Sequence, residues 1–200
     1  MNKKIVHDAL VLMAFALVLG GILGAVYQIT LPAITQAEYE KTQEAYMAVF
    51  ADAESFEELE YDKAAAAEMM AAGGFKDSID NVQKAIIGGE VAGYVVTVTA
   101  KDGSQGSITM SVGVRNDGTV NSYSITSIAE TPGLGMKAVE PDFIAKFEGK
   151  NVSEFVVVKT AASADYEIEA IAGSTITTDA VANAVNAALV YARSLVGGAQ

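Results

Sequence analysis

Residues 91–99 read Val-Ala-Gly-Tyr-Val-Val-Thr-Val-Thr, and this β-branched run decides the fold class of the 200-residue chain. Val, Tyr and Thr favour the extended, pleated backbone of a strand. Further strands are predicted at 84–87, 107–114, 120–128 and 154–159. Asp-Gly at 117–118 predicts a hairpin turn between two of them. Short strands joined by turns, with helices before and after them, predict an α+β domain with a mainly antiparallel sheet flanked by helices.

Helical patterns lie on both sides of these strands. Apolar residues recur with helical spacing at 33–50, and a second helix is expected at 64–72. Residues 136–147 predict a short amphipathic helix that Pro141 interrupts. The pattern at 178–196 predicts a longer helix, which Gly-Gly ends directly afterwards.

An apolar segment without charged residues occupies positions 9–31. As a helix it extends to roughly 34 Å, enough to cross a hydrocarbon core of about 30 Å. A cleaved signal peptide is the alternative, but its apolar core is usually shorter than this run. Lys3 and Lys4 precede the segment, whereas ten acids and only two lysines occupy 38–68. The positive-inside rule therefore predicts a cytoplasmic N-terminus and an extracytoplasmic remainder.

Composition excludes several functions. The formal net charge of −12 argues against nucleic acid as a partner. Because the chain has no cysteine, it forms no disulfide and offers no thiolate to zinc or to an iron–sulfur cluster. We predict no metal site and no catalytic residue, and the ten acids at 38–68 are expected to form a solvated helix face.

A hydroxyl-rich turn leads directly into the C-terminal helix: residues 171–179 read Ile-Ala-Gly-Ser-Thr-Ile-Thr-Thr-Asp. Thr177 or Thr178 is expected to cap the free amides of the first turn, and Asp179 suits the positive end of the helix dipole. A phosphate held just before such a turn meets unpaired N–H groups and a favourable dipole together. Thr175 sits where that phosphate would be.

A second turn, Glu130-Thr131-Pro132-Gly133-Leu134-Gly135, lies between strand and helix. Pro followed by Gly predicts a tight turn, and glycines remove side chains that would keep a flat ligand away from the backbone. Taken alone, a Pro-Gly turn more often binds nothing.

Together, segments 130–135 and 169–177 resemble the FMN-binding domain of the G subunit of the Rnf electron-transport complex. Members of that family carry the motif Asp-X-X-(Ser/Thr)-Gly-Ala-Thr, in which X is any residue. The last Thr of this motif is esterified to the phosphate of FMN. Thr175 matches that position. The pattern departs at three positions, which are Glu169 for Asp, Ala172 for Ser or Thr, and Ser174 for Ala.

The resemblance implies an electron-carrier subunit of a membrane complex that couples electron transfer between ferredoxin and NAD to sodium or proton translocation. Other flavin- and iron–sulfur-carrying membrane subunits are the implied partners, with a flavin transferase for maturation. The domains expected on this basis are a cytoplasmic N-terminus at 1–8, a transmembrane helix at 9–31, a helical connecting region at 32–83 and an extracytoplasmic FMN-binding domain at 84–200.

The expected cofactor-binding residues all lie in or beside the two turns: Thr131, Gly133, Leu134, Gly135, Lys137, Gly173, Ser174, Thr175, Thr177 and Thr178. Leu134 is expected to pack on the isoalloxazine ring, and Thr131 and Lys137 to bond to its polar edge or to the phosphate. Two alternatives stay open. One is the C subunit of a sodium-pumping NADH:quinone reductase, and the other is a membrane-anchored binding or scaffold module without covalent flavin.

Overall fold

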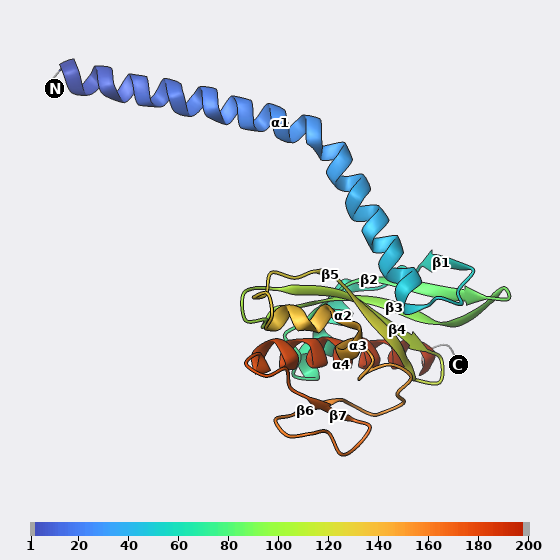
Figure 1. Cartoon of the computed structure of the whole chain (residues 1–200). Coiled ribbons are helices and arrows are strands. Elements are labelled where there is room, and N and C mark those ends of the chain that lie inside the picture. Colours follow the sequence, from blue (N-terminus) through green and yellow to red (C-terminus); the bar gives the residue numbers. More distant parts are fainter. Residues whose placement is uncertain (1–2, 198–200) are drawn as a thin grey trace. The chain divides into compact units, whose positions relative to one another are not determined.

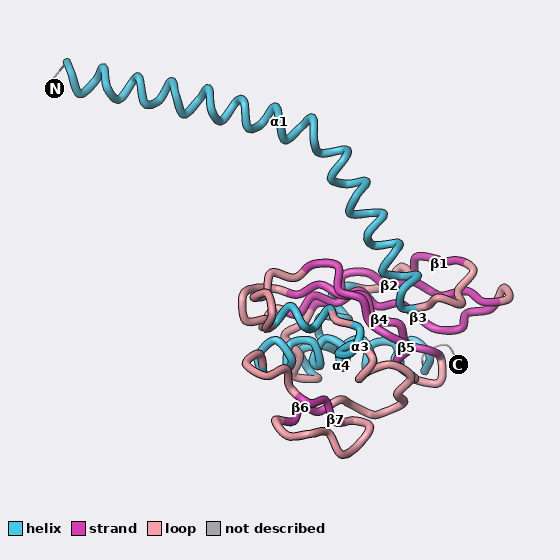
Figure 2. The backbone as a smooth tube through the Cα atoms, viewed as in Figure 1, coloured by secondary structure: helices cyan, strands magenta, loops and turns pink. Residues whose placement is uncertain are grey.

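The computed structural model describes residues 3–197 and divides between Lys41 and Thr42 into two compact units. Helix α1 (Lys3–Val49) runs through that boundary (Figure 2). By length and composition it is able to cross a membrane, and its apolar part is exposed. The predicted span and the helix expected at 33–50 form one helix, which continues past Pro32 and ends at Val49, one residue earlier than expected.

Five strands of the second unit form one sheet (Figure 1). They are β1 (Ser55–Glu58), β2 (Ser78–Ile87), β3 (Glu90–Ala100), β4 (Ile108–Arg115) and β5 (Val120–Ser127). Their spatial order follows the sequence, and every neighbouring pair is antiparallel. The predicted α+β class with a mainly antiparallel sheet is therefore confirmed.

The remaining elements are short except for one helix. They are α2 (Lys63–Ala72), the 3-10 helix η1 (Gly135–Val139), α3 (Pro141–Ile144), the parallel strands β6 (Val156–Val158) and β7 (Glu167–Glu169), and α4 (Thr175–Gly197). The helix predicted at 136–147 is thus two short helices that meet at Pro141, as the proline implies. Helix α4 packs along the sheet (Figure 1).

Alternation along β3 divides the apolar residues between two clusters. Val96 faces the main core, where α4 contributes Val185 and Leu189. Its neighbour Val95 faces a smaller cluster with Phe50. Successive strand residues point to opposite faces of a sheet, so both faces of β3 are covered.

Two glycines of the sheet make room for the end of α1. A Cβ atom at Gly113 would lie 2.6 Å from the carbonyl oxygen of Val49 and 3.1 Å from the Phe50 ring. At Gly93 a Cβ would lie 2.8 Å from that same ring. The Asn121 amide donates a hydrogen bond of 2.6 Å to the Val49 carbonyl. The last turn of α1 therefore packs directly on the backbone of the central strands.

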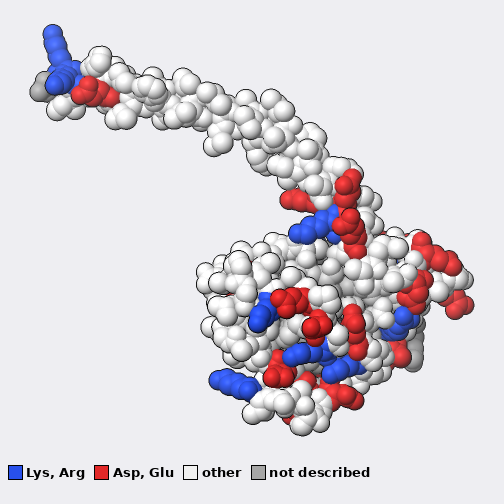
Figure 3. Space-filling view, viewed as in Figure 1, with Lys and Arg blue, Asp and Glu red and all other residues white. Residues whose placement is uncertain are grey.

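The region 32–83 differs from the helical connection expected there. It contains β1 and the first part of β2, both paired within the sheet. The acids of 38–68 are exposed as expected, but those of β1 lie on an edge strand rather than on a helix, and acidic side chains gather over this strand (Figure 3). An acidic edge strand also discourages pairing with another sheet.

Candidate functional site

The Pro-Gly segment forms a type II turn. The Leu134 amide donates to the Thr131 carbonyl at 3.1 Å, and Gly133 has φ 76°. A type II turn needs positive φ at its third residue, which glycine adopts without strain. The amide of Met136 donates to the same carbonyl at 3.2 Å and leads the chain into η1.

The hydroxyl-rich segment forms a turn of the same kind. Its closing bond runs from the Ser174 amide to the Ile171 carbonyl at 2.8 Å, and Gly173 at the third position has φ 79°. Gly133 and Gly173 are therefore needed for the positive φ at the third position of each turn, whether or not a ligand is bound.

The two turns meet. The Leu134 side chain lies 3.3 Å from the position that a Cβ of Gly173 would occupy. Leu134 is 42% exposed, and Ile176 in the first turn of α4 is 59% exposed. Thr175, which precedes Ile176 in the chain, is half-buried. The structure thus brings the predicted segments together around Thr175, with exposed apolar side chains beside it.

Helix α4 begins at Thr175, three residues earlier than predicted, and the capping roles given to Thr177 and Thr178 are wrong. Both threonines are buried inside the first turn. The Thr178 hydroxyl accepts from the Ile171 amide at 3.0 Å and donates to the Ser174 carbonyl at 2.9 Å, so it holds the glycine turn against the helix. Asp179 lies beyond the first turn and does not serve the helix dipole as expected.

The Thr177 hydroxyl is buried and has no hydrogen-bond partner within residues 3–197. It lies 2.9 Å from where a Cβ of Gly135 would be, and Glu130 Oε2 lies 2.7 Å from that same point. The other oxygen of Glu130 accepts from the Gln105 amide at 3.2 Å. Glycine at 135 therefore permits the close approach of the Pro-Gly segment to α4.

Lys137 lies near the glycine turn at 171–174. It lines a hollow of about 190 Å³ together with Ile171, Ala172 and Lys146. The Lys146 ammonium donates to the Glu169 carbonyl at 3.4 Å. Lys146 and Ile176 were not predicted as site residues. Ile176 could have been predicted from the sequence, because it directly follows Thr175. No local sequence pattern indicates that Lys146 lies near this turn.

Within the described residues 3–197, no group of three His, Cys, Asp or Glu side chains is arranged to hold a metal ion. The buried hydroxyl of Tyr123 donates to the Ala138 carbonyl at 2.7 Å, and burial, followed by the charge of Glu148, raises the pKa of this tyrosine. Tyr123 thus anchors η1 to the sheet.

Two family models match the chain. The FMN-binding domain matches residues 103–190, which include both glycine turns, and the RnfG N-terminal region matches residues 1–49. The second match covers the whole of α1.

Relatives among known proteins agree with these matches. The G subunit of the proton-translocating ferredoxin:NAD(+) oxidoreductase complex of Clostridium ljungdahlii is 32% identical over 179 residues, which are 90% of this chain and 86% of the relative. The G subunit of the Na(+)-translocating complex of Acetobacterium woodii is 39% identical over 109 residues, 54% of this chain and 52% of the relative.

Solved structures share the fold. NqrC of Shewanella oneidensis superposes with a TM-score of 0.50 at 22% identity, over 60% of this chain and 59% of that one. The C subunit of the Na(+)-translocating NADH-quinone reductase of Parabacteroides distasonis superposes with a TM-score of 0.50 at 24% identity. This superposition covers 72% of this chain and 78% of that one. The Clostridium ljungdahlii relative, which matches over 90% of this chain, is a G subunit, and the N-terminal family match is to RnfG. The chain therefore belongs to the RnfG family, the G subunits of ion-translocating ferredoxin:NAD(+) oxidoreductase complexes.

Proposed function

We propose that this chain is an electron-carrier subunit of a membrane complex that couples electron transfer between ferredoxin and NAD to sodium or proton movement, using FMN esterified to Thr175. Family membership supports the subunit role, and the FMN-binding domain match supports the cofactor. The observation that carries the proposal is the meeting of two glycine turns beside the half-buried Thr175.

The residues around Thr175 fit the groups of FMN. Thr178 makes the first intrahelical bond of α4, from its amide to the Ser174 carbonyl at 3.0 Å, so the amides of 175–177 are free to face a phosphate. Leu134 and Ile176 offer exposed apolar surface to a flat ring. The unpartnered Thr177 hydroxyl offers a buried hydrogen-bonding group of the kind that a ligand satisfies.

When bound, FMN supplies one- or two-electron redox chemistry, and the chain sets its position. The Thr175 hydroxyl has no hydrogen-bond partner within residues 3–197, so no described side chain is placed to remove its proton. A threonine hydroxyl is a poor nucleophile without such a base. We therefore expect a flavin transferase to form the proposed ester. Lys137 supplies a positive charge beside the glycine turn.

Ala172, where the family pattern has a hydroxyl, does not weaken the turn. Ala172 is exposed, and the turn is closed by backbone atoms and by Thr178 instead. The missing hydroxyl therefore leaves the geometry in front of Thr175 intact, which favours the flavin carrier over a flavin-free scaffold module.

The test is made on the purified membrane complex. Denaturing electrophoresis is expected to give in-gel flavin fluorescence at the mass of this chain, and reduced ferredoxin is expected to bleach the flavin absorbance before denaturation. A complex that carries out ferredoxin:NAD electron transfer without any flavin on this chain would contradict the proposal.

The C subunit of the quinone reductase is the alternative that the sequence left open, and its solved structures share the fold. The two candidates use the same chemistry and differ in partners. The proteins that co-purify with the chain separate them, and the RnfG match at residues 1–49 favours the ferredoxin-linked complex.

We also propose that the N-terminus is cytoplasmic and that the flavin domain lies outside the membrane, on the basis of the charges on the two sides of the candidate span. The chain has no cysteine, so single cysteines report on topology without background. In intact cells, a membrane-impermeant maleimide is expected to label the exposed Asp165→Cys and to label His7→Cys only after lysis. The reverse pattern would place the domain inside.

Replacing Thr177 by valine tests the proposed role of its hydroxyl. Removing a buried hydroxyl without a partner is expected to stabilise the flavin-free chain by about 1 kcal/mol. Flavin attachment is then expected to raise the melting temperature of the wild-type chain more than that of Thr177→Val. An equal rise in both, measured by thermal unfolding with and without transferase co-expression, would show that the hydroxyl does not contact the flavin.

A further inference from the structure

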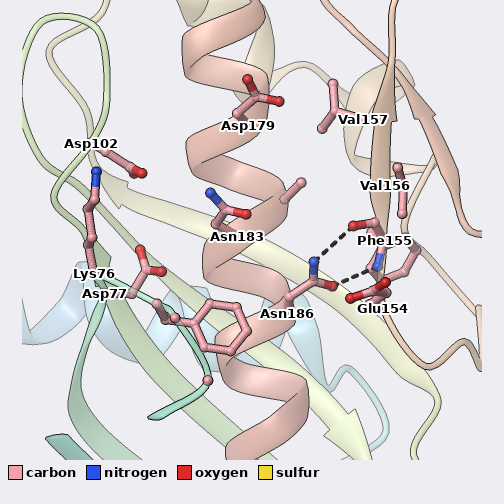
Figure 4. A pocket seen from close by; sticks show the side chains of 14 residues that line it. Lys76, Asp77, Asp102, Glu154, Phe155, Val156, Val157, Asp179, Asn183 and Asn186 are labelled. Atoms are coloured by element: carbon pink, nitrogen blue, oxygen red, sulfur yellow. Dashed lines mark hydrogen bonds between the residues drawn. The ribbon is translucent and has the colours of Figure 1, made fainter. Parts of the chain in front are cut away.

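A cavity of about 500 Å³ lies along α4 and is lined by residues other than those of the two glycine turns. Its walls come from four parts of the domain: the segment after α2, the loop that holds Asp102, the start of β6, and α4 (Figure 4). None of the residues proposed to bind FMN lines it. Its volume is within the range of small-molecule sites, ~300 to 1,000 Å³.

Three aspartates from distant segments line this cavity: Asp77, Asp102 and Asp179. Asp77 is only 6% exposed, and its Oδ1 has no hydrogen-bond partner within residues 3–197. The buried Oδ1 of Asp102 also has none among those residues. A buried carboxylate oxygen without a donor is costly, so both oxygens favour a ligand that donates.

The charge of Asp102 influences both other carboxylates. Burial, followed by the charge of Asp102, raises the pKa of Asp77 to about 6, although Lys101 opposes this effect. Burial, followed again by Asp102, also raises the pKa of Asp179, against the charge of Lys159. Asp102 therefore lies within electrostatic reach of both other acids, and the cavity is a negatively charged site at neutral pH.

The remaining walls are neutral or apolar, apart from Lys76 and Glu154. Phe75 supplies an aromatic ring and Asn183 an amide. Asn186 is already engaged: its oxygen accepts from the Phe155 amide at 2.7 Å and its nitrogen donates to the Phe155 carbonyl at 2.9 Å (Figure 4). These two bonds fix the segment before β6 against α4, so that wall is held in place without a ligand.

Size and geometry exclude a bare metal ion as the best occupant. The acids of residues 3–197 include no group of three arranged to hold a metal. The cavity is also much larger than a metal ion with its ligands. A planar cation with several N–H donors suits the site better, because it pairs with carboxylates through parallel hydrogen bonds and stacks on an aromatic ring.

We propose that the acidic cavity lined by Asp77, Asp102, Asp179 and Phe75 binds the guanidinium group of an organic cation. The buried Asp77 and the Asp102 oxygen accept its N–H groups, and Phe75 supplies aromatic surface to the same cavity. The guanidinium belongs either to a free small molecule or to an arginine side chain of a neighbouring polypeptide. The inference does not depend on FMN, because no residue is shared between the two sites.

Calorimetric titration of the full chain in detergent micelles tests this proposal, with agmatine as the probe for a free cation and acetyl-arginine methylamide as the probe for a peptide-borne one. Saturable binding of agmatine alone supports a free ligand, and binding of both supports an arginine side chain. Asp77→Asn and Asp102→Asn are each expected to weaken binding at least tenfold. The matched control is Asp165→Asn, which removes the same charge at an exposed position.

The pH dependence gives a second readout. Binding to wild type is expected to weaken as the pH falls from 7.5 to 5.5, since Asp77 then takes up a proton. Cooperative thermal melting confirms that each variant is folded. The proposal is overturned if neither probe saturates, if sodium or magnesium ions compete at equal concentration, or if folded Asp77→Asn and Asp102→Asn both bind like wild type.

Discussion

Thr175→Ala is expected to lose all covalently bound flavin, seen as disappearance of the fluorescent band on a denaturing gel. The ester requires a hydroxyl at this position, and alanine has none. The fold is expected to survive, because Thr175 is half-buried at the first position of α4 and alanine is a good helix former. Unfolding free energy is expected to change by less than about 0.5 kcal/mol.

Three controls make this result specific. Thr175→Ser keeps a hydroxyl and is expected to retain the band at reduced intensity. Thr177→Val and Thr160→Ala are expected to retain it fully, since neither hydroxyl is the proposed acceptor. A band that persists in Thr175→Ala but disappears in Thr177→Val would move the attachment point two residues along the helix. Thermal melts of all four variants exclude misfolding as the cause.

Gly113→Ala is expected to destabilise the domain by about 2–3 kcal/mol, because it overpacks a filled site. Its Cβ would lie 2.6 Å from the Val49 carbonyl oxygen, which is backbone and moves only if the end of α1 moves. The same shift would break the hydrogen bond from Asn121 to that carbonyl. A fall in the melting temperature of about 5–10 °C measures the effect.

Gly197→Ala is the matched control, because a Cβ there meets nothing within 4 Å and the residue lies in a helix. Alanine is expected to be neutral or slightly stabilising at that position. An unchanged melting temperature in Gly113→Ala would show that the end of α1 does not rest on the sheet as described.

The sheet was largely predictable because its central strands carry their own signals. Residues 91–99 are rich in β-branched side chains, and Asp-Gly at 117–118 joins β4 to β5. By contrast, β1 is a four-residue edge strand with only Phe56 as an apolar residue, and its conformation depends on pairing with β2. Strand β7 has three residues and depends on β6 in the same way. Short strands specified by their partners leave little pattern in their own sequence.

The two glycine turns were identified from sequence, but their contacts were not. The run from Ser174 to Thr178 offers four hydroxyls in five residues, so local rules allow several helix starts. Tertiary packing selects among them, since Gly135 brings the Pro-Gly segment against Thr177. The acidic cavity could not be anticipated at all, because its aspartates are separated by 25 and 77 positions along the chain.

The hydroxyl of Thr178 that bonds to both Ile171 and Ser174 also makes the closed glycine turn depend on the first turn of α4. This bond forms only when the first turn of α4 exists, and α4 reaches its place by covering the sheet with residues such as Val185 and Leu189. A transferase that recognises the glycine turn packed against Leu134 would therefore modify only chains in which the two segments have already come together. Flavin on Thr175 would then serve as a mark of completed folding, and unfinished or misfolded copies would remain colourless.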